Sequence, residues 1–250
     1  MSSSGPSEGH AAAPCAVDVW TIHLAAPQHE IECAGALLSP DERARAARFH
    51  FDRHRRAFVL GRAGLRILLA QRLGVPPQSV EFQYGPKGKP ALAGCASRLR
   101  FNASNSGDLA ACCFTESCEI GIDIEQARPL SEVQDIAHRF FSPEEVSELM
   151  ALAEPERPAA FFRCWTRKEA YIKAVGDGLS LPLDDFRVTL TANDAARIVH
   201  LGGSAEAAAG WSMHDFAPAP EYFGAVTYPD RARTFKLHPL LSAEELLSRL

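Results

Sequence analysis

The chain has 250 residues, of which 46% are hydrophobic and 23% are charged, and its formal net charge is −5. This balance is typical of a globular protein with a hydrophobic core, and the negative charge argues against general nucleic-acid binding. No run approaches the roughly 18 consecutive apolar residues of a membrane-spanning helix, and residues 1–14 lack the basic start and apolar centre of a signal peptide. We therefore expect a cytoplasmic protein, free of the membrane, with a disordered tail at residues 1–14.

Two helix starts of the same form divide the chain, one at Ser39–Glu42 and one at Ser142–Glu145. In each, a serine can cap the helix, a proline suits the first helical position, and an acid three residues after the serine completes a capping box. Each start is followed by a short helix, a longer helix and a strand-like run. We expect the longer helices near residues 53–73 and 158–175, and the runs near 80–82 and 186–190.

Strands are indicated elsewhere by β-branched and aromatic residues, at residues 16–24, 98–102, 109–114, 118–125, 186–190, 197–201, 211–216 and 222–228. A short last helix starts at Ser242. Because helices and strands interleave without a regular βαβ rhythm, the pattern predicts the α+β class. Together with the repeated helix start, it predicts a pseudo-dimer of two similar α+β halves, residues 15–126 and 127–250.

The first long helix and its approach carry a cluster of positive charge. Residues 41–75 contain nine arginines against three acids, which suits a small polyanion better than a long one. At helical spacing, Arg55, Arg62 and Arg66 share one face. The alternative is that this face is only solvated.

A strand with the sequence GIDIE at residues 121–125 carries two acids on one face. Alternate residues of a strand share a face, so Ile120, Ile122 and Ile124 should point into a core, and Asp123 and Glu125 away from it. Two carboxylates side by side repel each other unless a cation or solvent lies between them. An ordinary strand with a wet acidic face is the alternative.

The second long helix places Trp165, Glu169 and Lys173 along one stripe, at intervals of four residues. Alone, this stripe could be a surface Glu–Lys pair beside a packed tryptophan. Magnesium prefers oxygen ligands, usually one or two carboxylates with water and substrate phosphate. If the strand acids meet Glu169 between the halves, they form a magnesium site, and Lys173 would reach the phosphate oxygens.

These motifs resemble the paired signatures of the Sfp-type 4′-phosphopantetheinyl transferase family. The matching stretches are GKP at 88–90, FNASNSG at 101–107, GIDIE at 121–125, RFFSPEE at 139–145 and FFRCWTRKEAYIKAVGDGLSLPLDDF at 161–186. The resemblance implies the fold of that family, with the active site between two similar halves. It also implies that the 4′-phosphopantetheine of coenzyme A is transferred to a serine of an acyl or peptidyl carrier protein, releasing adenosine 3′,5′-bisphosphate.

The resemblance also assigns roles to individual residues. Asp123, Glu125 and Glu169 resemble the magnesium ligands, and either Glu169 or a metal-bound water would accept the proton of the attacking serine. Lys173 resembles the lysine placed at the diphosphate, where it acts in catalysis and in binding coenzyme A.

The remaining assignments concern the phosphates of coenzyme A. Lys89 and Ser104 resemble phosphate contacts, and an arginine near Arg56 resembles the one that holds the 3′-phosphate, a task that Arg62 or Arg66 could share. After Ser104 the family commonly has a histidine that touches these phosphates, whereas this chain has Asn105. An asparagine can donate a hydrogen bond but carries no charge.

Two other functions use the same residues. One is a metal-dependent pyrophosphate hydrolase, in which water replaces the serine. The other is a non-catalytic module that holds coenzyme A or a carrier protein. Carriers of fatty-acid, polyketide and nonribosomal peptide synthesis all remain open, and the length of the chain favours a monomer that is itself a pseudo-dimer.

Overall fold

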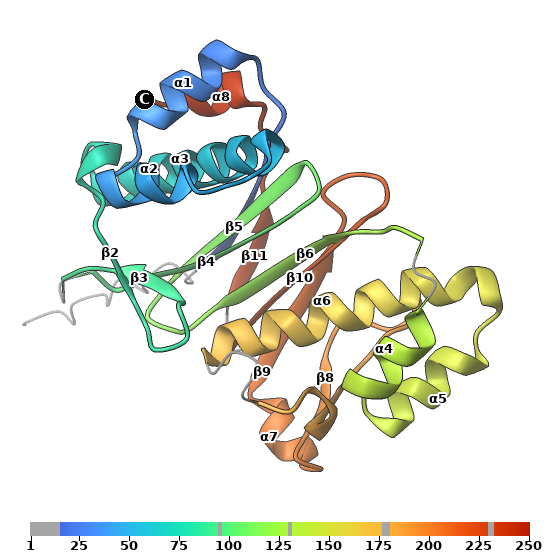
Figure 1. Cartoon of the computed structure of the whole chain (residues 1–250). Helices are drawn as coiled ribbons and strands as arrows, with labels where there is room; N and C mark the ends of the chain where they lie inside the picture. Colours follow the sequence, from blue (N-terminus) through green and yellow to red (C-terminus); the bar gives the residue numbers. More distant parts are fainter. Residues whose placement is uncertain (1–15, 95–96, 130–131, 177–180, 230–232) are drawn as a thin grey trace, which may run out of the picture.

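The computed structural model describes residues 16–94, 97–129, 132–176, 181–229 and 233–250, so the predicted tail at 1–14 lies outside the described residues. Strands occupy the middle of the molecule, with one group of helices above them and another below (Figure 1). This arrangement confirms the predicted α+β class. Among the described residues, no helix combines the length and the apolar character needed to cross a membrane.

The first group surrounds a four-stranded sheet in the order β11-β1-β5-β4. Strand β11 runs parallel to β1, and β5 is antiparallel to both of its neighbours. The strands are β1 (Ala16–His23), β4 (Leu99–Ser106), β5 (Leu109–Glu116) and β11 (Thr234–Leu237). Around them lie the helices α1 (Gln28–Ala36), α2 (Pro40–Ala46), α3 (Asp52–Leu73) and α8 (Ala243–Leu247), a 3₁₀ turn at Pro77–Ser79, and the hairpin of β2 (Phe82–Tyr84) and β3 (Pro90–Leu92).

The second group surrounds an antiparallel sheet in the order β6-β10-β9. Its strands are β6 (Gly121–Gln126), β9 (Trp211–Phe216) and β10 (Tyr222–Pro229), and α6 (Arg157–Val175) packs across β6 and β10. The smaller elements are α4 (Val133–Phe140), α5 (Pro143–Ala151), a 3₁₀ turn at Glu154–Glu156, a 3₁₀ turn at Leu183–Asp185, the pair β7 (Phe186–Val188) and β8 (Ile198–Leu201), and α7 (Ala205–Ala209).

Each half has its own hydrophobic core, and a third core joins the two sheets. The joining core contains side chains of β1 and β5 from one sheet and of β6 and β10 from the other. Ile120, Ile122 and Ile124 are fully buried in it, as the alternation of the GIDIE strand predicts. Because these isoleucines face the core, the acids of the same strand face α6.

The repeated helix start is a real structural repeat. Glu42 accepts the backbone N–H of Ser39, and Glu145 accepts that of Ser142, so both capping boxes are formed. Each glutamate also binds a buried cation on the long helix of its half, Arg66 at 2.6 Å and Lys168 at 2.7 Å. Each cation donates in turn to two backbone carbonyls beyond its helix, those of Pro77 and Val80 in the first half and of Leu183 and Phe186 in the second.

Strand pairing crosses the predicted boundary at residue 126. Strand β6 ends at that residue but pairs with β10 of the second half, and β11 lies in the second half but pairs with β1 of the first. The division into the two halves 15–126 and 127–250 stays a prediction. The strand predicted at 98–102 runs from Leu99 to Ser106, because its backbone pairs with β5 along this whole length.

Candidate functional site

The site lies where the edge strands of the two sheets meet. Strand β4 ends one sheet and β6 ends the other, and the two run side by side with α6 packed over β6 (Figure 1). This seam brings the FNASNSG stretch next to GIDIE and the second long helix. Side chains far apart in the chain therefore face one another here.

A hydrogen-bonded cluster from three elements occupies the centre of the seam. The Lys173 ammonium lies 2.6 Å from Asp123 Oδ1 and 3.0 Å from Ser104 Oγ, and the Ser104 hydroxyl donates to the same carboxylate oxygen at 2.8 Å. Asp123 is only 3% exposed, and its other oxygen, Oδ2, is buried and has no hydrogen-bond partner within the described part of the chain. An unpartnered buried carboxylate oxygen is costly, so this atom is open to a further partner.

Gly121 determines how closely α6 can approach the strand. A Cβ atom at this position would lie 2.1 Å from the carbonyl oxygen of Ala170 and 2.3 Å from the backbone nitrogen of Ala174. Only a glycine admits the helix backbone at this distance. The close approach brings Lys173 within reach of Asp123.

The other two acids are half-buried beside this cluster. Glu125 accepts a hydrogen bond from the Ser106 hydroxyl at 2.7 Å. Burial raises the pKa of Glu125, while the Ser106 hydrogen bond opposes that rise and the charge of Asp123 adds to it. Burial likewise raises the pKa of Glu169, with further increases from Asp123 and Glu125 and a decrease from Lys173. The negative charge of Asp123 therefore acts on both glutamates.

The fit of these acids to a cation has evidence on both sides. Across the described ranges, no group of three or more histidine, cysteine, aspartate or glutamate side chains is already arranged to hold a metal ion. Instead, Lys173 neutralises one oxygen of Asp123. The residue types fit a hard divalent cation, because all three are carboxylates, one has an unpartnered oxygen, and the pKa values of the other two are raised.

The structure separates the three arginines that the sequence offers for the 3′-phosphate. Arg66 is 2% exposed, and its guanidinium donates hydrogen bonds to Glu42 and to two backbone carbonyls. Arg62 lies 3.4 Å from the same glutamate and packs over the ring of Phe82. Both arginines pair with Glu42 and so hold α3 to its surroundings.

Arg56 instead lines an open pocket of about 710 Å³ beside the end of β4. Its guanidinium donates to Gln28 Oε1 at 2.8 Å and to the carbonyl of Ala26. The exposed Asn105 lines the same pocket. Other polar residues around it are Arg53, His54, Ser106 and Arg128, with Asp52 and Asp108 as the acids.

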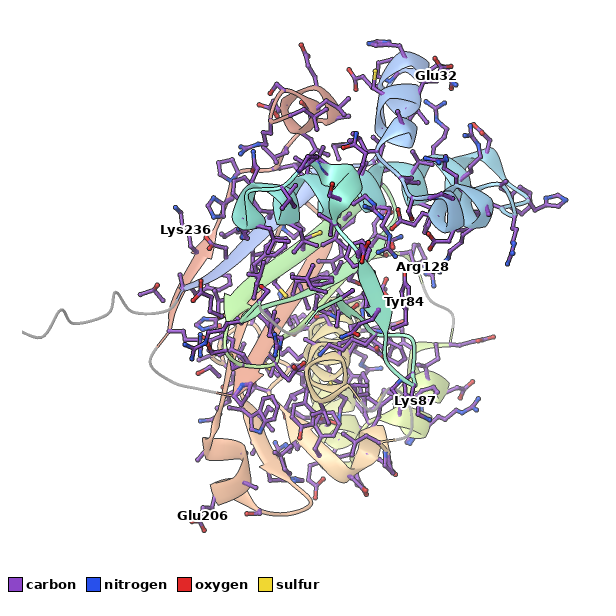
Figure 2. The ribbon with its side chains drawn as sticks, turned by 90° about the vertical axis from the view of Figure 1, so that its left-hand side faces the viewer. Glu32, Tyr84, Lys87, Arg128, Glu206 and Lys236 are labelled. Carbon is purple, nitrogen blue, oxygen red and sulfur yellow. The ribbon has the colours of Figure 1, made fainter. Side chains whose placement is uncertain are left out.

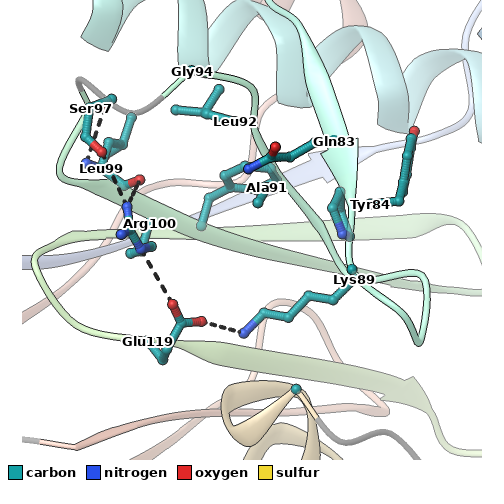
Figure 3. Close-up of a pocket in the computed structure, with 14 residues that line it drawn as sticks. Gln83, Tyr84, Lys89, Ala91, Leu92, Gly94, Ser97, Leu99, Arg100 and Glu119 are labelled. Carbon is teal, nitrogen blue, oxygen red and sulfur yellow. Dashed lines mark hydrogen bonds and ion pairs between the residues drawn. The ribbon is translucent and has the colours of Figure 1, made fainter.

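Lys89 lies on the other side of the seam, at the start of β3. Its ammonium binds Glu119 Oε2 at 2.8 Å and the carbonyl of Ala174 at 3.2 Å, and Glu119 also pairs with Arg100 (Figure 3). Lys89 lines both the 580 Å³ pocket of Figure 3 and a smaller pocket of about 270 Å³ that Glu169 and Lys173 also line. Lys89 therefore shares a pocket with Lys173 of α6.

Sequence reasoning passed over two residues at the seam. Ser106 binds Glu125 directly, and the alternation Ser104, Ser106 opposite Asp123, Glu125 was the available signal. Arg128 lines the pocket of Arg56 and lowers the pKa of Glu125 through its charge. In the view of Figure 2 it projects between the upper and lower halves, on the side that carries Tyr84 and Lys87.

Comparisons with known proteins match both halves. A family model described as the 4′-phosphopantetheinyl transferase superfamily matches residues 119–224, and one described as 4′-phosphopantetheinyl transferase, N-terminal, matches residues 25–116. The 4′-phosphopantetheinyl transferase HetI of Nostoc sp. is 40% identical over 212 residues, which cover 84% of this chain and 86% of that protein.

Two further relatives have lower identity. The 4′-phosphopantetheinyl transferase Sfp of Bacillus subtilis is 35% identical over 174 residues, covering 69% of this chain and 76% of that protein. The 4′-phosphopantetheinyl transferase psf-1 of Bacillus pumilus is 32% identical over 169 residues, covering 68% and 71%.

Proposed function

Because the chain belongs to the 4′-phosphopantetheinyl transferase family of the Sfp type, we propose that its seam is the active site, at which the 4′-phosphopantetheine of coenzyme A passes to a serine of a carrier protein. The observation that carries this proposal is the contact of Lys173 with Asp123 at 2.6 Å. This contact brings together, between the halves, the two motifs on which the resemblance mainly depends, GIDIE at 121–125 and the stretch at 161–186.

Asp123, Glu125 and Glu169 would hold a magnesium ion. Two observations support this assignment: one oxygen of Asp123 has no partner, and the pKa values of the two glutamates are raised. A cation would give that oxygen a partner and would stabilise the charged form of both glutamates. Magnesium at this place would neutralise the diphosphate of coenzyme A and orient it for displacement. Asp123, Glu125 and Glu169 would be the ligands that the protein supplies to this ion.

Lys173 is the protein's own cation at the reacting group. In the transfer, the serine oxygen forms a bond to the phosphorus next to pantetheine, and the bond from that phosphorus to the bridging oxygen of the diphosphate breaks. The leaving adenosine 3′,5′-bisphosphate gains negative charge, which an ammonium group at this place stabilises. Glu169 lines the same small pocket as Lys173 and is our candidate to accept the serine proton.

The phosphates of coenzyme A would be held at two places, the 3′-phosphate beside this centre and the diphosphate at it. Arg56 and Asn105 share the pocket at the end of β4, and we assign the 3′-phosphate to that pocket. Lys89 and Ser104 would contact the diphosphate, Lys89 after releasing Glu119. We do not carry Arg62 and Arg66 into this assignment, because Glu42 and the packing of α3 already engage them.

The test is a transfer assay with intact mass measurement of apo carrier proteins from fatty-acid, polyketide and nonribosomal peptide synthesis. We expect at least one carrier to gain the mass of one phosphopantetheine when coenzyme A and magnesium are present. Hydrolysis of coenzyme A without any carrier would favour the hydrolase, and binding without turnover would favour the non-catalytic module. Light scattering in the same buffer tests the expected monomer.

A further inference from the structure

Hydrogen bonds made by side chains join the two edge strands at the seam, and the described residues of β4 and β6 belong to separate sheets. Edge strands leave backbone N–H and C=O groups without a strand partner. Here β4 supplies side-chain oxygens to β6: Asn102 Oδ1 accepts the N–H of Ile122 at 3.0 Å, and Ser106 Oγ accepts that of Gln126 at 3.1 Å. The polar residues of β4 therefore fix the position of β6.

The serines of β4 also match the acids of β6 in register. Ser104 donates to Asp123 at 2.8 Å and Ser106 to Glu125 at 2.7 Å, and each pair is 19 residues apart in the chain. Because alternate residues of a strand share a face, the two serines lie side by side opposite the two carboxylates.

The two serines differ in what else they touch. The Ser104 hydroxyl is shared between Asp123 and Lys173 and so belongs to the cluster at the reacting group. The Ser106 hydroxyl both donates to and accepts from β6, through Glu125 and the N–H of Gln126. A serine hydroxyl has one hydrogen to donate, so Glu125 takes the whole donor capacity of Ser106.

We propose that Ser106 is a positioning residue, which fixes one oxygen of Glu125 and leaves the other for a divalent cation. The inference rests on the proposed magnesium role of Glu125. A free glutamate side chain must lose rotamer freedom when it binds a metal, and a hydrogen bond made beforehand reduces that loss. Groups that hold a metal ligand in this way typically contribute about 10- to 100-fold to metal affinity.

The test measures metal binding without turnover. Binding of Mn²⁺ to the full chain is followed by electron paramagnetic resonance, with neither coenzyme A nor carrier present. We expect Ser106→Ala to weaken Mn²⁺ binding by about 10- to 100-fold, and Ser106→Thr, which keeps the hydroxyl, to stay near the parent. Ser97→Ala is the matched control, because Ser97 also accepts a backbone N–H, that of Leu99, but touches no carboxylate of the seam.

A double-mutant cycle assigns the effect to Glu125. In a Glu125→Ala background, Ser106→Ala should weaken Mn²⁺ binding no further, because the group it positions is gone. Unchanged Mn²⁺ affinity in Ser106→Ala, an equal loss in Ser97→Ala, or an undiminished loss in the Glu125→Ala background would each overturn the inference while leaving the magnesium proposal intact. A parent protein that binds no Mn²⁺ would instead overturn both.

Discussion

Replacing Gly121 with alanine tests whether the close approach of α6 to β6 creates the site. The added Cβ would lie 2.1 Å from the Ala170 carbonyl oxygen, 2.3 Å from the Ala174 nitrogen and 2.8 Å from the Lys173 carbonyl carbon. Carbon contacts are favourable at roughly 3.5 Å, so the helix must move by about 1 Å or more. All three atoms belong to the helix backbone, and a side-chain rotation cannot relieve the clash.

Two consequences follow from that displacement. Overpacking of this kind typically costs about 1–3 kcal/mol of folding free energy. Lys173 and Glu169 would move away from Asp123, and a misplacement of about 1 Å can lower a catalytic rate by roughly 100-fold. We therefore expect Gly121→Ala to remain folded with reduced stability and to lose most of its transfer activity.

The assay combines urea unfolding with transfer of phosphopantetheine to an apo carrier, followed by intact mass. Gly210→Ala is the control, because a Cβ at Gly210 would meet its nearest atom, the Ala207 carbonyl oxygen, at 3.9 Å. If Gly121→Ala matched this control in both stability and transfer rate, the close approach would not be what positions Lys173, and the reasoning would be refuted.

Three further predictions concern the charges of the site. Asp123→Ala should stay folded and lower the transfer rate by on the order of 100- to 1,000-fold. Full activity of this variant, or full activity of the parent protein in excess chelator, would contradict the magnesium role. Arg56→Ala should reduce the preference for coenzyme A over dephospho-coenzyme A by about tenfold in kcat/KM. Arg66→Ala should instead leave the preference ratio unchanged and lower the free energy of unfolding in urea by up to about 3–5 kcal/mol, because it removes the closer of the two arginines that pair with buried Glu42 and leaves only Arg62, at 3.4 Å. Asn105→His should tighten coenzyme A binding in calorimetric titrations by about 1 kcal/mol, more at pH 6 than at pH 8, because an imidazole with an ordinary pKa of about 6.5 carries its charge mainly below that pH; equal affinities of variant and parent at both pH values would show that position 105 does not touch the phosphates.

The local elements of this protein can be read from its sequence. The capping boxes of Ser39 and Ser142 predict where α2 and α5 begin, and the structure confirms both. The alternation of the GIDIE strand predicts which residues enter the core, and the three isoleucines are fully buried there. These signals are readable because they depend on residues within a few positions of one another.

The choice among the arginines of α3 could not be read in the same way. Arg56 and Arg66 both lie on one amphipathic helix, and the spacing of the sequence offers either one to a phosphate. The burial of Glu42 beneath α3 decides the outcome, because a buried carboxylate needs a cation and Arg66 is 2.6 Å away. Only Arg56 of these two reaches the pocket beside Asn105.

The sequence by itself therefore determined the residue types of the site, the α+β class and the repeated order of its elements. The tertiary structure alone decided which side chains meet. Ser106 faces Glu125 because β4 and β6, the edge strands of two different sheets, lie side by side. Strand β11 completes the first sheet from more than 200 residues away, with Lys236 opposite Asp18. Such pairings depend on long-range packing, because the alternation within one strand does not specify which other strand will lie beside it.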